Sequence, residues 1–560
     1  MGLRRQQYSF FSIWVLLLLL LGFASAVYDG PLYDFTAYTE CKARPEHPLY
    51  NGGILQDQRA KLRHRSYNAA SGSSPQIVLR NLTGNTYYCF SGWVRINEAG
   101  ASDVLIKASL ASENTTYDCI GTVIARSRCW SFLKGGFALT SPVNSSRITF
   151  QSNFKNNVTV SVASSSLQPF TEEEWRFNQQ YIINKVRKRA VTLHVSDSQG
   201  RIIQGAKIKV HQTSKEFPFG SAIAKTIIGN EPYQEWFAKR FNTAVFENEL
   251  KWYATEAVRG VVNYTVADQM MRFVRRNKIV TRGHNIFWDD PKYTPGWVLN
   301  LTAAELRAAV TSRMRSLMEK YRNEFIHWDV DNEMLHFHLY EERLGPNATL
   351  GFFEAVREAD PLATLFMNDF NVVETCSDAN STVDAYIAKL KEFGRYGVPM
   401  AGVGLEGHFS APNMPLIRAV IDKFATLNLP IWLTEVDIIN SIDGQTQATY
   451  LDQVLREGYA HPAVNGMIMW TAIHPYGCYQ MCLTDQNFKN LPTGEAVDKL
   501  IEEWQTGKIE GFTDDHGTYS FFGFLGEHGV TIEHANVTQS STLALARAGP
   551  HEARHVYIVL

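Results

Sequence analysis

The stretch at residues 325–333, FIHWDVDNE, is a short, largely apolar run that ends in an amide and a carboxylic acid. The stretch at 431–437, IWLTEVD, has the same form. Such runs are typical of strands buried in a parallel sheet, and amphipathic helical stretches lie between them. Counting outward gives eight strand-like runs, each followed by a helical stretch: 217–223, 243–246, 279–287, 325–330, 364–368, 402–405, 431–434 and 465–470. This α/β pattern predicts a (β/α)8 TIM barrel, whose catalytic groups lie at the carboxyl ends of the strands.

The barrel, which we place at residues 213–507, takes up about half of the 560-residue chain. Residues 30–165 lack helical periodicity and carry short β-branched and aromatic runs between Gly, Ser and Asn clusters, which predicts an antiparallel β-sandwich. Residues 166–212 are expected to form a linker and a β-hairpin. Residues 508–560 predict a small β-rich tail that pairs with this hairpin in one flanking sheet.

The amino terminus predicts secretion. Two arginines precede an apolar run at 13–23, and small residues at 24–26 provide a cleavage site, so residues 1–26 are expected to be a signal peptide. The run is shorter than the roughly 20 residues that a membrane-spanning helix needs. Nine Asn-x-Ser/Thr sequons fit a glycosylating route: Asn81, Asn114, Asn144, Asn157, Asn263, Asn300, Asn347, Asn380 and Asn536. We therefore expect an extracellular glycoprotein without stable membrane association.

The seven cysteines of a secreted chain are expected mostly to pair. Cys478 and Cys482 could staple one loop, and Cys376 would then be left over as a thiol. The other four could form two bridges of undetermined connectivity: Cys41, Cys89, Cys119 and Cys129.

Composition points to a neutral partner. Lys and Arg number 54 and Asp and Glu 56, so the net charge is −2 and no basic surface for nucleic acid or an anionic membrane is expected. Some of the 12 Trp, 24 Tyr and 32 Phe can serve as flat platforms for sugars, although most such rings lie in a core. No Cys/His spacing indicates zinc, and His336 and His338 lack a third ligand, so we predict neither a metal nor a cofactor.

Polar residues cluster where the predicted strands end. The fourth run ends in Asn332 and Glu333, and the seventh continues into Glu435. Hydrolysis of a glycosidic bond needs one carboxyl that holds a proton and a second that attacks the anomeric carbon. One Glu at a strand end would be an ordinary loop residue or half of an ion pair, but two at opposite strand ends with neutral hydrogen-bonding neighbours indicate a catalytic pair. His408 is suited to hold Glu435 ionised, whereas Trp288 and Trp470 could stack on sugars or belong to the core.

These residues resemble the motifs of the family 10 glycoside hydrolases, which are retaining endo-β-1,4-xylanases built on a (β/α)8 barrel. Four motifs occur in order: Glu-Asn-x-x-Lys-Trp at 247–252, Arg-Gly-His-x-x-x-Trp at 282–288, Trp-Asp-Val-x-Asn-Glu at 328–333 and Thr-Glu-Val-Asp at 434–437. The resemblance implies that Glu333 is the general acid/base and Glu435 the nucleophile of a double displacement on xylan. It also implies that these residues line the xylan subsites: Glu247, Asn248, Lys251, His284, Trp288, Asn332, His408 and Trp470.

Two further segments carry weaker resemblances. The run W-x-x-L-x-G-G-F at 130–137 is similar to family 22 carbohydrate-binding modules, so the front sandwich is expected to bind polysaccharide. The loop CYQMCLTD at 478–485 is similar to that of plant members, which implies a location in the cell wall. We expect a monomer whose partner is xylan or a related β-1,4-linked polysaccharide.

The chain departs from the family pattern at three places. Glu406 stands where most members have Gln, and a third carboxyl near Glu435 would raise one of their pKa values. Asp289 replaces a histidine, and the strand-eight loop lacks a second Trp, for which Tyr476 or Tyr479 could substitute. Together with Asp437, Glu406 is expected to modulate the catalytic pair.

A retaining double displacement predicts carboxyl groups about 5 to 5.5 Å apart. Two other functions stay open at this point. A transglycosylase shares the covalent intermediate but passes the glycosyl group to another sugar. A non-catalytic wall protein would hold polysaccharide without cleaving it.

Overall fold

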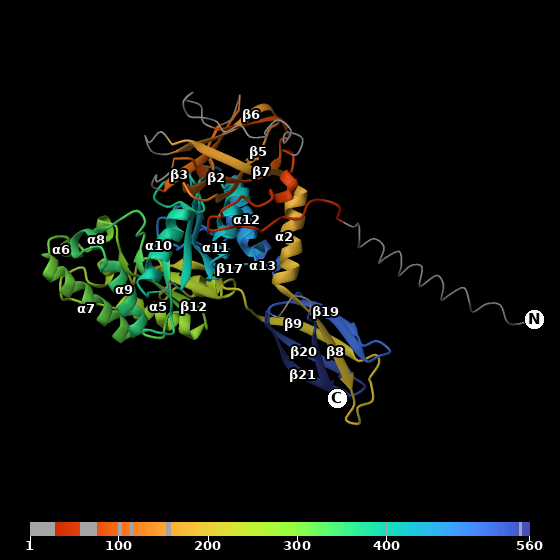
Figure 1. Ribbon diagram of the computed structural model, residues 1–560. Coiled ribbons are helices and arrows are strands. Elements are labelled where there is room, and N and C mark those ends of the chain that lie inside the picture. Colours follow the sequence, from red (N-terminus) through yellow and green to blue (C-terminus); the bar gives the residue numbers. More distant parts are fainter. Residues whose placement is uncertain are drawn as a thin grey trace, which may run out of the picture.

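The computed structural model describes residues 28–55, 75–98, 103–112, 116–152, 158–398, 401–547 and 552–560. A front β-sandwich lies on one side of a barrel and a second, smaller β-sandwich lies beyond the other side, with helix α2 (Glu172–Val186) running between them (Figure 1). The predicted signal peptide and the sequons at Asn114 and Asn157 lie outside the described residues. In the described part, no helix is long and apolar enough to cross a membrane.

Eight parallel strands close the barrel, as predicted. They are β10 (Phe219–Ile223), β11 (Thr243–Phe246), β12 (Val280–Trp288), β13 (His327–Asn332), β14 (Thr364–Asp369), β15 (Gly402–Phe409), β16 (Ile431–Ile438) and β17 (Val464–Met469). Strands β15 and β16 continue past residues 405 and 434, where the sequence pattern ended them, because register shifts beside Glu406 and Glu435 let pairing resume. The polar residues that were expected after these strands therefore lie within them.

Helices follow every barrel strand and surround the barrel (Figure 1). They are α3 (Glu231–Ala238), α4 (Trp252–Thr255), α5 (Thr265–Arg276), α6 (Gly296–Leu299), α7 (Ala303–Tyr321), α8 (Leu339–Leu344), α9 (Ala348–Ala359), α10 (Val383–Arg395), α11 (Met414–Ala425), α12 (Gly444–Ala460) and α13 (Pro492–Glu503). Helix α7 begins at a capping box in which Thr302 and Glu305 each bond the other's backbone N–H. Leu306, Val310 and Leu317 form its buried face.

The front unit is an antiparallel sandwich, as predicted. One sheet has the order β1 (Gln76–Leu82), β6 (Val143–Ser152), β3 (Val104–Ser112), β4 (Thr116–Ala125), and the other β5 (Ser131–Leu139), β2 (Thr86–Ile96), β7 (Val160–Thr171). Strand β5 packs against α11 of the barrel. Lys134 Nζ on β5 lies 2.6 Å from Asp422 Oδ2 on α11, and these side chains are 3% and 0% exposed. The sandwich is thus fixed to the barrel by a buried ion pair.

The disulfides confirm the staple within one loop and correct two predictions, because the four front cysteines form one bridge among themselves, not two, and Cys376 is paired. They are Cys41–Cys129, Cys119–Cys376 and Cys478–Cys482. Cys376 is not left over, because the loop that follows β14 lies against β4, where Ser377 also donates to Asp118 (2.9 Å). The free thiol is Cys89, which is buried. The front sandwich is therefore linked covalently to a loop at the carboxyl end of the barrel.

The predicted hairpin is limited to its turn, where Ser196 and Ile202 form an antiparallel bridge, and the predicted single flanking sheet is wrong. Strands β8 (Lys188–Ser196) and β9 (Lys207–Lys215) lie in different sheets. One sheet has the order β19 (Thr518–Phe524), β8, β22 (Arg554–Val559), and the other β18 (Ile509–Phe512), β9, β20 (Gly526–His534), β21 (Val537–Leu545). Each strand has one apolar face, and the two sheets bury these faces against each other around Leu193 and Ile208. Helix α2 occupies most of the predicted linker.

Candidate active site

The turn that follows β13 positions the predicted acid. Glu333 has a φ of +61°, a left-handed conformation that is uncommon for residues other than glycine and asparagine. Its N–H donates to the backbone oxygen of Asn368 on β14 (3.0 Å), which holds the turn in place. Strained backbone of this kind is concentrated at functional sites. The Glu333 side chain is buried, with 7% of the residue exposed.

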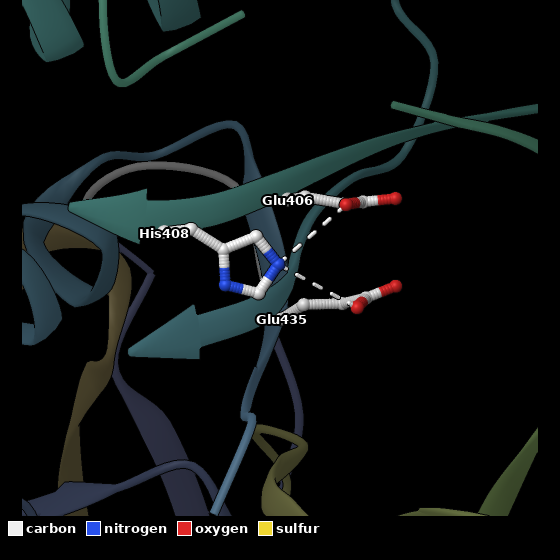
Figure 2. A group of neighbouring side chains, drawn as sticks. All are labelled: Glu406, His408 and Glu435. Carbon is white, nitrogen blue, oxygen red and sulfur yellow. Dashed lines mark ion pairs between the residues drawn. The ribbon is translucent and has the colours of Figure 1, made fainter. Parts of the chain in front are cut away.

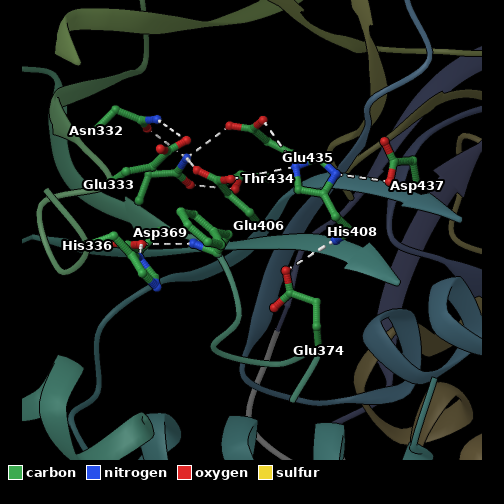
Figure 3. Close-up of polar contacts among 12 residues, drawn as sticks. Asn332, Glu333, His336, Asp369, Glu374, Glu406, His408, Thr434, Glu435 and Asp437 are labelled. Carbon is green, nitrogen blue, oxygen red and sulfur yellow. Dashed lines mark hydrogen bonds and ion pairs between the residues drawn. The ribbon is translucent and has the colours of Figure 1, made fainter. Parts of the chain in front are cut away.

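Asn368 connects the two predicted catalytic residues. Its Nδ2 lies 3.0 Å from both Asn332 Oδ1 and Glu435 Oε1, and its Oδ1 accepts a hydrogen bond from the Thr434 hydroxyl. Asn332 Nδ2 in turn donates to Glu333 Oε1 (3.3 Å) (Figure 3). A chain of side-chain amides therefore holds the two carboxyls in a fixed relation.

Glu435 is surrounded by basic groups. His284 Nε2 lies 3.9 Å from one of its carboxylate oxygens and His408 Nε2 3.8 Å from the other. Burial alone would raise the pKa of Glu435, but His284, His408 and Lys251 outweigh burial and lower it to about 2. Glu435 is thus an anion at neutral pH.

Glu333 has the opposite environment. Burial, reinforced by the negative charges of Glu435 and Asp369, raises the pKa of Glu333 to about 8, and the Trp288 indole and Lys251 oppose this shift only in part. Glu333 therefore holds a proton at neutral pH. One site thus contains a neutral carboxylic acid and a carboxylate, which is the pairing that acid-assisted nucleophilic chemistry needs.

His408 is oriented by Asp437, its neighbour across the β15–β16 ladder. His408 Nδ1 lies 2.9 Å from Asp437 Oδ1 (Figure 3). Burial lowers the pKa of His408, but bonds with Asp437, Glu406 and Glu435 outweigh burial and raise it well above its usual value. The protonated ring therefore presents its Nε2–H to the Glu435 carboxylate.

Glu406 and Glu435 both face the Nε2 edge of the His408 ring (Figure 2). The Glu406 Oε2 atom is 3.6 Å from His408 Nε2. Within the described residues these three side chains form the one group of His, Cys, Asp and Glu whose donor atoms suit a metal ion, all lying within 4.8 Å of one another. The protonated His408 ring has no free lone pair, however, so we do not assign these residues as metal ligands, and acid-assisted glycoside hydrolysis requires no metal.

Aromatic rings lie beside the catalytic pair. Lys251 Nζ is 4.2 Å from the ring centre of Trp288 and 5.6 Å from that of Trp470. Trp288 stacks on Tyr293, with ring centres 3.9 Å apart, and remains partly exposed. Trp470 is 5% exposed and packs edge-on against His284. Trp288 thus keeps an exposed part, whereas Trp470 is mostly core.

The residues predicted on strand two form a separate polar group. Glu247 accepts a hydrogen bond from Asn248 Nδ2 (3.0 Å), and Tyr253 donates to Asn248 Oδ1 (2.6 Å). The second partner of Glu247 is His474, whose Nε2 lies 2.5 Å from Glu247 Oε2. This contact joins the loop after β17 to the end of β11.

The residues at which the chain departs from the family pattern after Trp288 and after β17 have different surroundings in the structure. Asp289 is 1% exposed and accepts a hydrogen bond from the backbone N–H of Tyr340 (3.2 Å), so it supports the backbone. The Tyr479 ring lies 5.7 Å from the His408 ring, whereas Tyr476 is fully exposed. Of the two tyrosines, Tyr479 is therefore the one beside the catalytic residues.

Sequence reasoning missed several partners. Asn368 ends the fifth strand-like run, and its position at a strand end is the signal that could have identified it. His474 lies in the loop after β17 and Tyr293 in the short 3-10 helix Pro291–Tyr293, where no spacing marks them. A cavity of about 700 Å³ lies at the opposite, amino-terminal end of the barrel, lined by residues such as Lys215 and Trp504, and contains none of the predicted site residues.

Similarity to known proteins agrees with this geometry. Residues 208–497 match the model of glycosyl hydrolase family 10. The chain is 33% identical to endo-1,4-beta-xylanase 4 of Arabidopsis thaliana over 91% of this chain and 88% of that protein, and 35% identical to endo-1,4-beta-xylanase 5 of the same plant over 83% of each. It is also 35% identical to the anti-sigma-I factor RsgI6 of Acetivibrio thermocellus over 65% of this chain and 47% of that protein.

Among solved structures, native xylanase 10B from Thermotoga maritima is 25% identical, with a TM-score of 0.45 over 51% of this chain and 97% of that one. Xylanase 10B from Thermotoga petrophila, in complex with xylobiose, is 24% identical, with a TM-score of 0.46 over 51% of this chain and 94% of that one. The family model covers the whole barrel, and two relatives span most of the chain. The chain therefore belongs to glycosyl hydrolase family 10.

Proposed function

We propose that the chain is a retaining endo-1,4-β-xylanase, with Glu333 as the general acid/base and Glu435 as the nucleophile. The observation that carries this proposal is that Asn332 and Asn368 connect two buried carboxyls at barrel strand ends whose surroundings differ, because His284 and His408 lie beside Glu435 whereas Glu333 is buried near other carboxylates. These surroundings raise the pKa of Glu333 and lower that of Glu435. The names of the two relatives that span most of the chain support xylan as the substrate.

In the first step, a Glu435 oxygen attacks the anomeric carbon while the bond from that carbon to the leaving sugar oxygen breaks. Glu333 gives its proton to the leaving oxygen and becomes a carboxylate. The product is a glycosyl ester of Glu435. Because Glu435 is no longer charged, the main negative charge that raised the pKa of Glu333 is gone, and Glu333 is a stable carboxylate in the intermediate.

In the second step, the Glu333 carboxylate takes a proton from a water molecule, whose oxygen attacks the anomeric carbon. The ester bond breaks and Glu435 returns as a carboxylate. Two inversions at one carbon retain the β configuration. Asn332, next to Glu333, is placed to bond the sugar 2-hydroxyl, and Trp288 to stack on a sugar ring.

We further propose that the chain acts outside the cell, on cell-wall polysaccharide. Three disulfides support an oxidising compartment, in agreement with the leader-like residues 1–26. The front sandwich would bind polysaccharide, on the strength of its residues 130–137.

Reducing-end release from glucuronoxylan and arabinoxylan tests the proposal, with cellulose and mannan as controls. The wild-type protein should cleave xylan selectively, and Glu435→Ala and Glu333→Gln should abolish cleavage while the far-UV spectrum stays native. Proton NMR of the first product should show the β anomer. A folded protein that is retained on xylan but releases no ends would overturn the hydrolase, and products longer than the substrate would indicate a transglycosylase.

A further inference from the structure

Glu406 and Glu435 form a closely spaced carboxyl pair. They are register partners on β15 and β16, and Glu406 Oε1 and Glu435 Oε1 lie 2.9 Å and 3.0 Å from the same nitrogen, Asn368 Nδ2. His408 Nε2 lies 3.6 Å and 3.8 Å from their other oxygens (Figure 2). The two residues are 2% and 5% exposed, so water does not screen their charges.

The hydrogen atoms available to this pair are few. Asn368 has two N–H groups, and Asn332 Oδ1 also lies 3.0 Å from the same nitrogen. His408 uses Nδ1 on Asp437 and has one hydrogen left on Nε2. Two adjacent carboxylates would share these donors, whereas one carboxylate and one carboxylic acid need fewer and add a hydroxyl donor.

The charges that face the pair lead to the same conclusion. The titratable groups that face the pair lie on β12, β15 and β16 and in the segments that follow β11, β13 and β14: Lys251, His284, His408, Glu333, Glu374 and Asp437. His408 Nδ1 pairs with Asp437. Among the carboxyls around Lys251, Glu435 has the largest electrostatic effect on the ammonium group. Glu333 already holds the proton that it donates. Among the described residues, His408 and Lys251 are thus shared with Asp437 and Glu435, and neither is paired with Glu406 alone.

We propose that Glu406 is a positioning residue that keeps a proton in the resting enzyme, so that Glu435 is the single anion of the pair and is held at the attack position by Asn368 and His408. This inference rests on the proposed role of Glu435 as nucleophile. Burial, followed by the charges of Glu435 and Glu333, raises the pKa of Glu406 well above its usual value, which agrees with the geometry. A glutamine at residue 406 would also be neutral, but it could not titrate.

The proton on Glu406 responds to the reaction. When Glu435 becomes a glycosyl ester, its charge is gone and the repulsion that kept Glu406 protonated falls. The Glu406 carboxyl is therefore more acidic in the intermediate than in the resting enzyme. The active site thus contains a second titrating proton besides the one that Glu333 transfers.

Infrared difference spectroscopy tests the resting state directly. The spectrum of Glu333→Gln/Glu406→Gln is subtracted from that of Glu333→Gln at pH 7. Both variants carry Glu333→Gln so that the proton of Glu333 does not contribute. We expect the difference to contain the C=O stretch of one protonated carboxylic acid and no carboxylate band. A carboxylate band in its place would overturn the proposal. Because this measurement needs only folded protein, it holds even if Glu435 is not the nucleophile.

A kinetic test asks whether the proton affects catalysis. An aryl β-xylobioside with an activated leaving group needs no acid, so in a Glu333→Ala background kcat/KM reports the attack of Glu435 alone. We expect kcat/KM to fall by about tenfold per pH unit once Glu406 ionises and competes for Asn368. The fall should be absent in Glu333→Ala/Glu406→Gln. If Glu406 had a purely structural role, Glu406→Gln would lower kcat/KM by the same factor at every pH. Alkaline limbs of the same shape in the two variants would therefore refute the proposal.

The two failures are distinguishable. If no glycosyl ester forms on Glu435 and Glu333→Ala releases no aryl group at any pH, the double displacement is wrong while the infrared result still decides the state of Glu406. If aryl release occurs but the infrared difference shows a carboxylate, the nucleophile assignment stands and the role of Glu406 is wrong.

Discussion

The bridge between Cys119 and Cys376 should be needed for both stability and activity. Cys376 lies in the loop after β14, which contacts His408 and also His336, whose backbone N–H donates to the backbone oxygen of Glu333. Glu374 accepts a hydrogen bond from the backbone N–H of His408 (3.2 Å), and Asp378 lies 3.0 Å from His336 Nε2. We predict that Cys119→Ala/Cys376→Ala loosens this loop from the front sandwich.

The expected loss follows from the length of chain that the bridge closes. The two cysteines are 257 residues apart in sequence. Loop-closure entropy for that length amounts to about 5 kcal/mol of stability. Cys478 and Cys482 are 4 residues apart, and the same relation gives about 2 kcal/mol for their bridge. The Cys478→Ala/Cys482→Ala variant is therefore a matched control that removes one disulfide but little chain constraint.

Urea unfolding followed by tryptophan fluorescence, together with xylan cleavage at each urea concentration, would measure both effects. The Cys119→Ala/Cys376→Ala variant should unfold at a clearly lower midpoint than the control. It should also lose activity before its fluorescence changes, because the loop is released before the barrel unfolds. Equal midpoints for the two variants, with activity and fluorescence lost together, would refute the reasoning.

Three further perturbations test other parts of the structure. On xylan, the plot of kcat/KM against pH should be bell-shaped. It should fall toward about pH 2 as Glu435 takes up a proton and above about pH 8 as Glu333 loses its proton. An alkaline limb that stays level well above pH 8 would contradict the assignment of Glu333. Lys134→Met should cost about 3–5 kcal/mol in urea unfolding because it leaves the Asp422 carboxylate buried without its ammonium partner. Lys134→Met/Asp422→Asn should recover part of that loss, because asparagine removes the charge and keeps an acceptor for the Tyr33 hydroxyl. Asn332→Ala should lower kcat/KM on xylan by roughly 30-fold, equivalent to about 2 kcal/mol of transition-state binding, and the loss should disappear on a substrate that lacks the 2-hydroxyl.

The barrel was predictable because its strands are buried on both faces. Such strands are continuous apolar runs, and eight of them with helices between leave few other folds. The ends of β15 and β16 were not predictable, since Glu406 and Glu435 are polar residues that remain in the ladder after a register shift. A shift of this kind depends on the neighbouring strand, which local pattern does not contain.

The errors outside the barrel have the same cause, because a local sequence pattern does not contain the partner of a strand or of a cysteine. Strands β8 and β9 both alternate in polarity, and alternation shows that a strand has one buried face but does not show which sheet covers it. The partner of Cys376 could not be found from spacing, because a disulfide requires two Cα atoms within a few ångströms and these lie 5.6 Å apart only in the folded chain.

The sequence by itself determined the barrel and the two carboxyls that we propose as catalytic, because a strand's apolar run and the polar residue that ends it are local features of the chain. Only the tertiary structure decided which carboxyls are charged. The state of Glu333, Glu406 and Glu435 depends on burial and on charges that arrive from other strands. Those charges, such as Lys251 and His408, come close only when the barrel closes, since electrostatic energy depends on distance in space and not on separation along the chain.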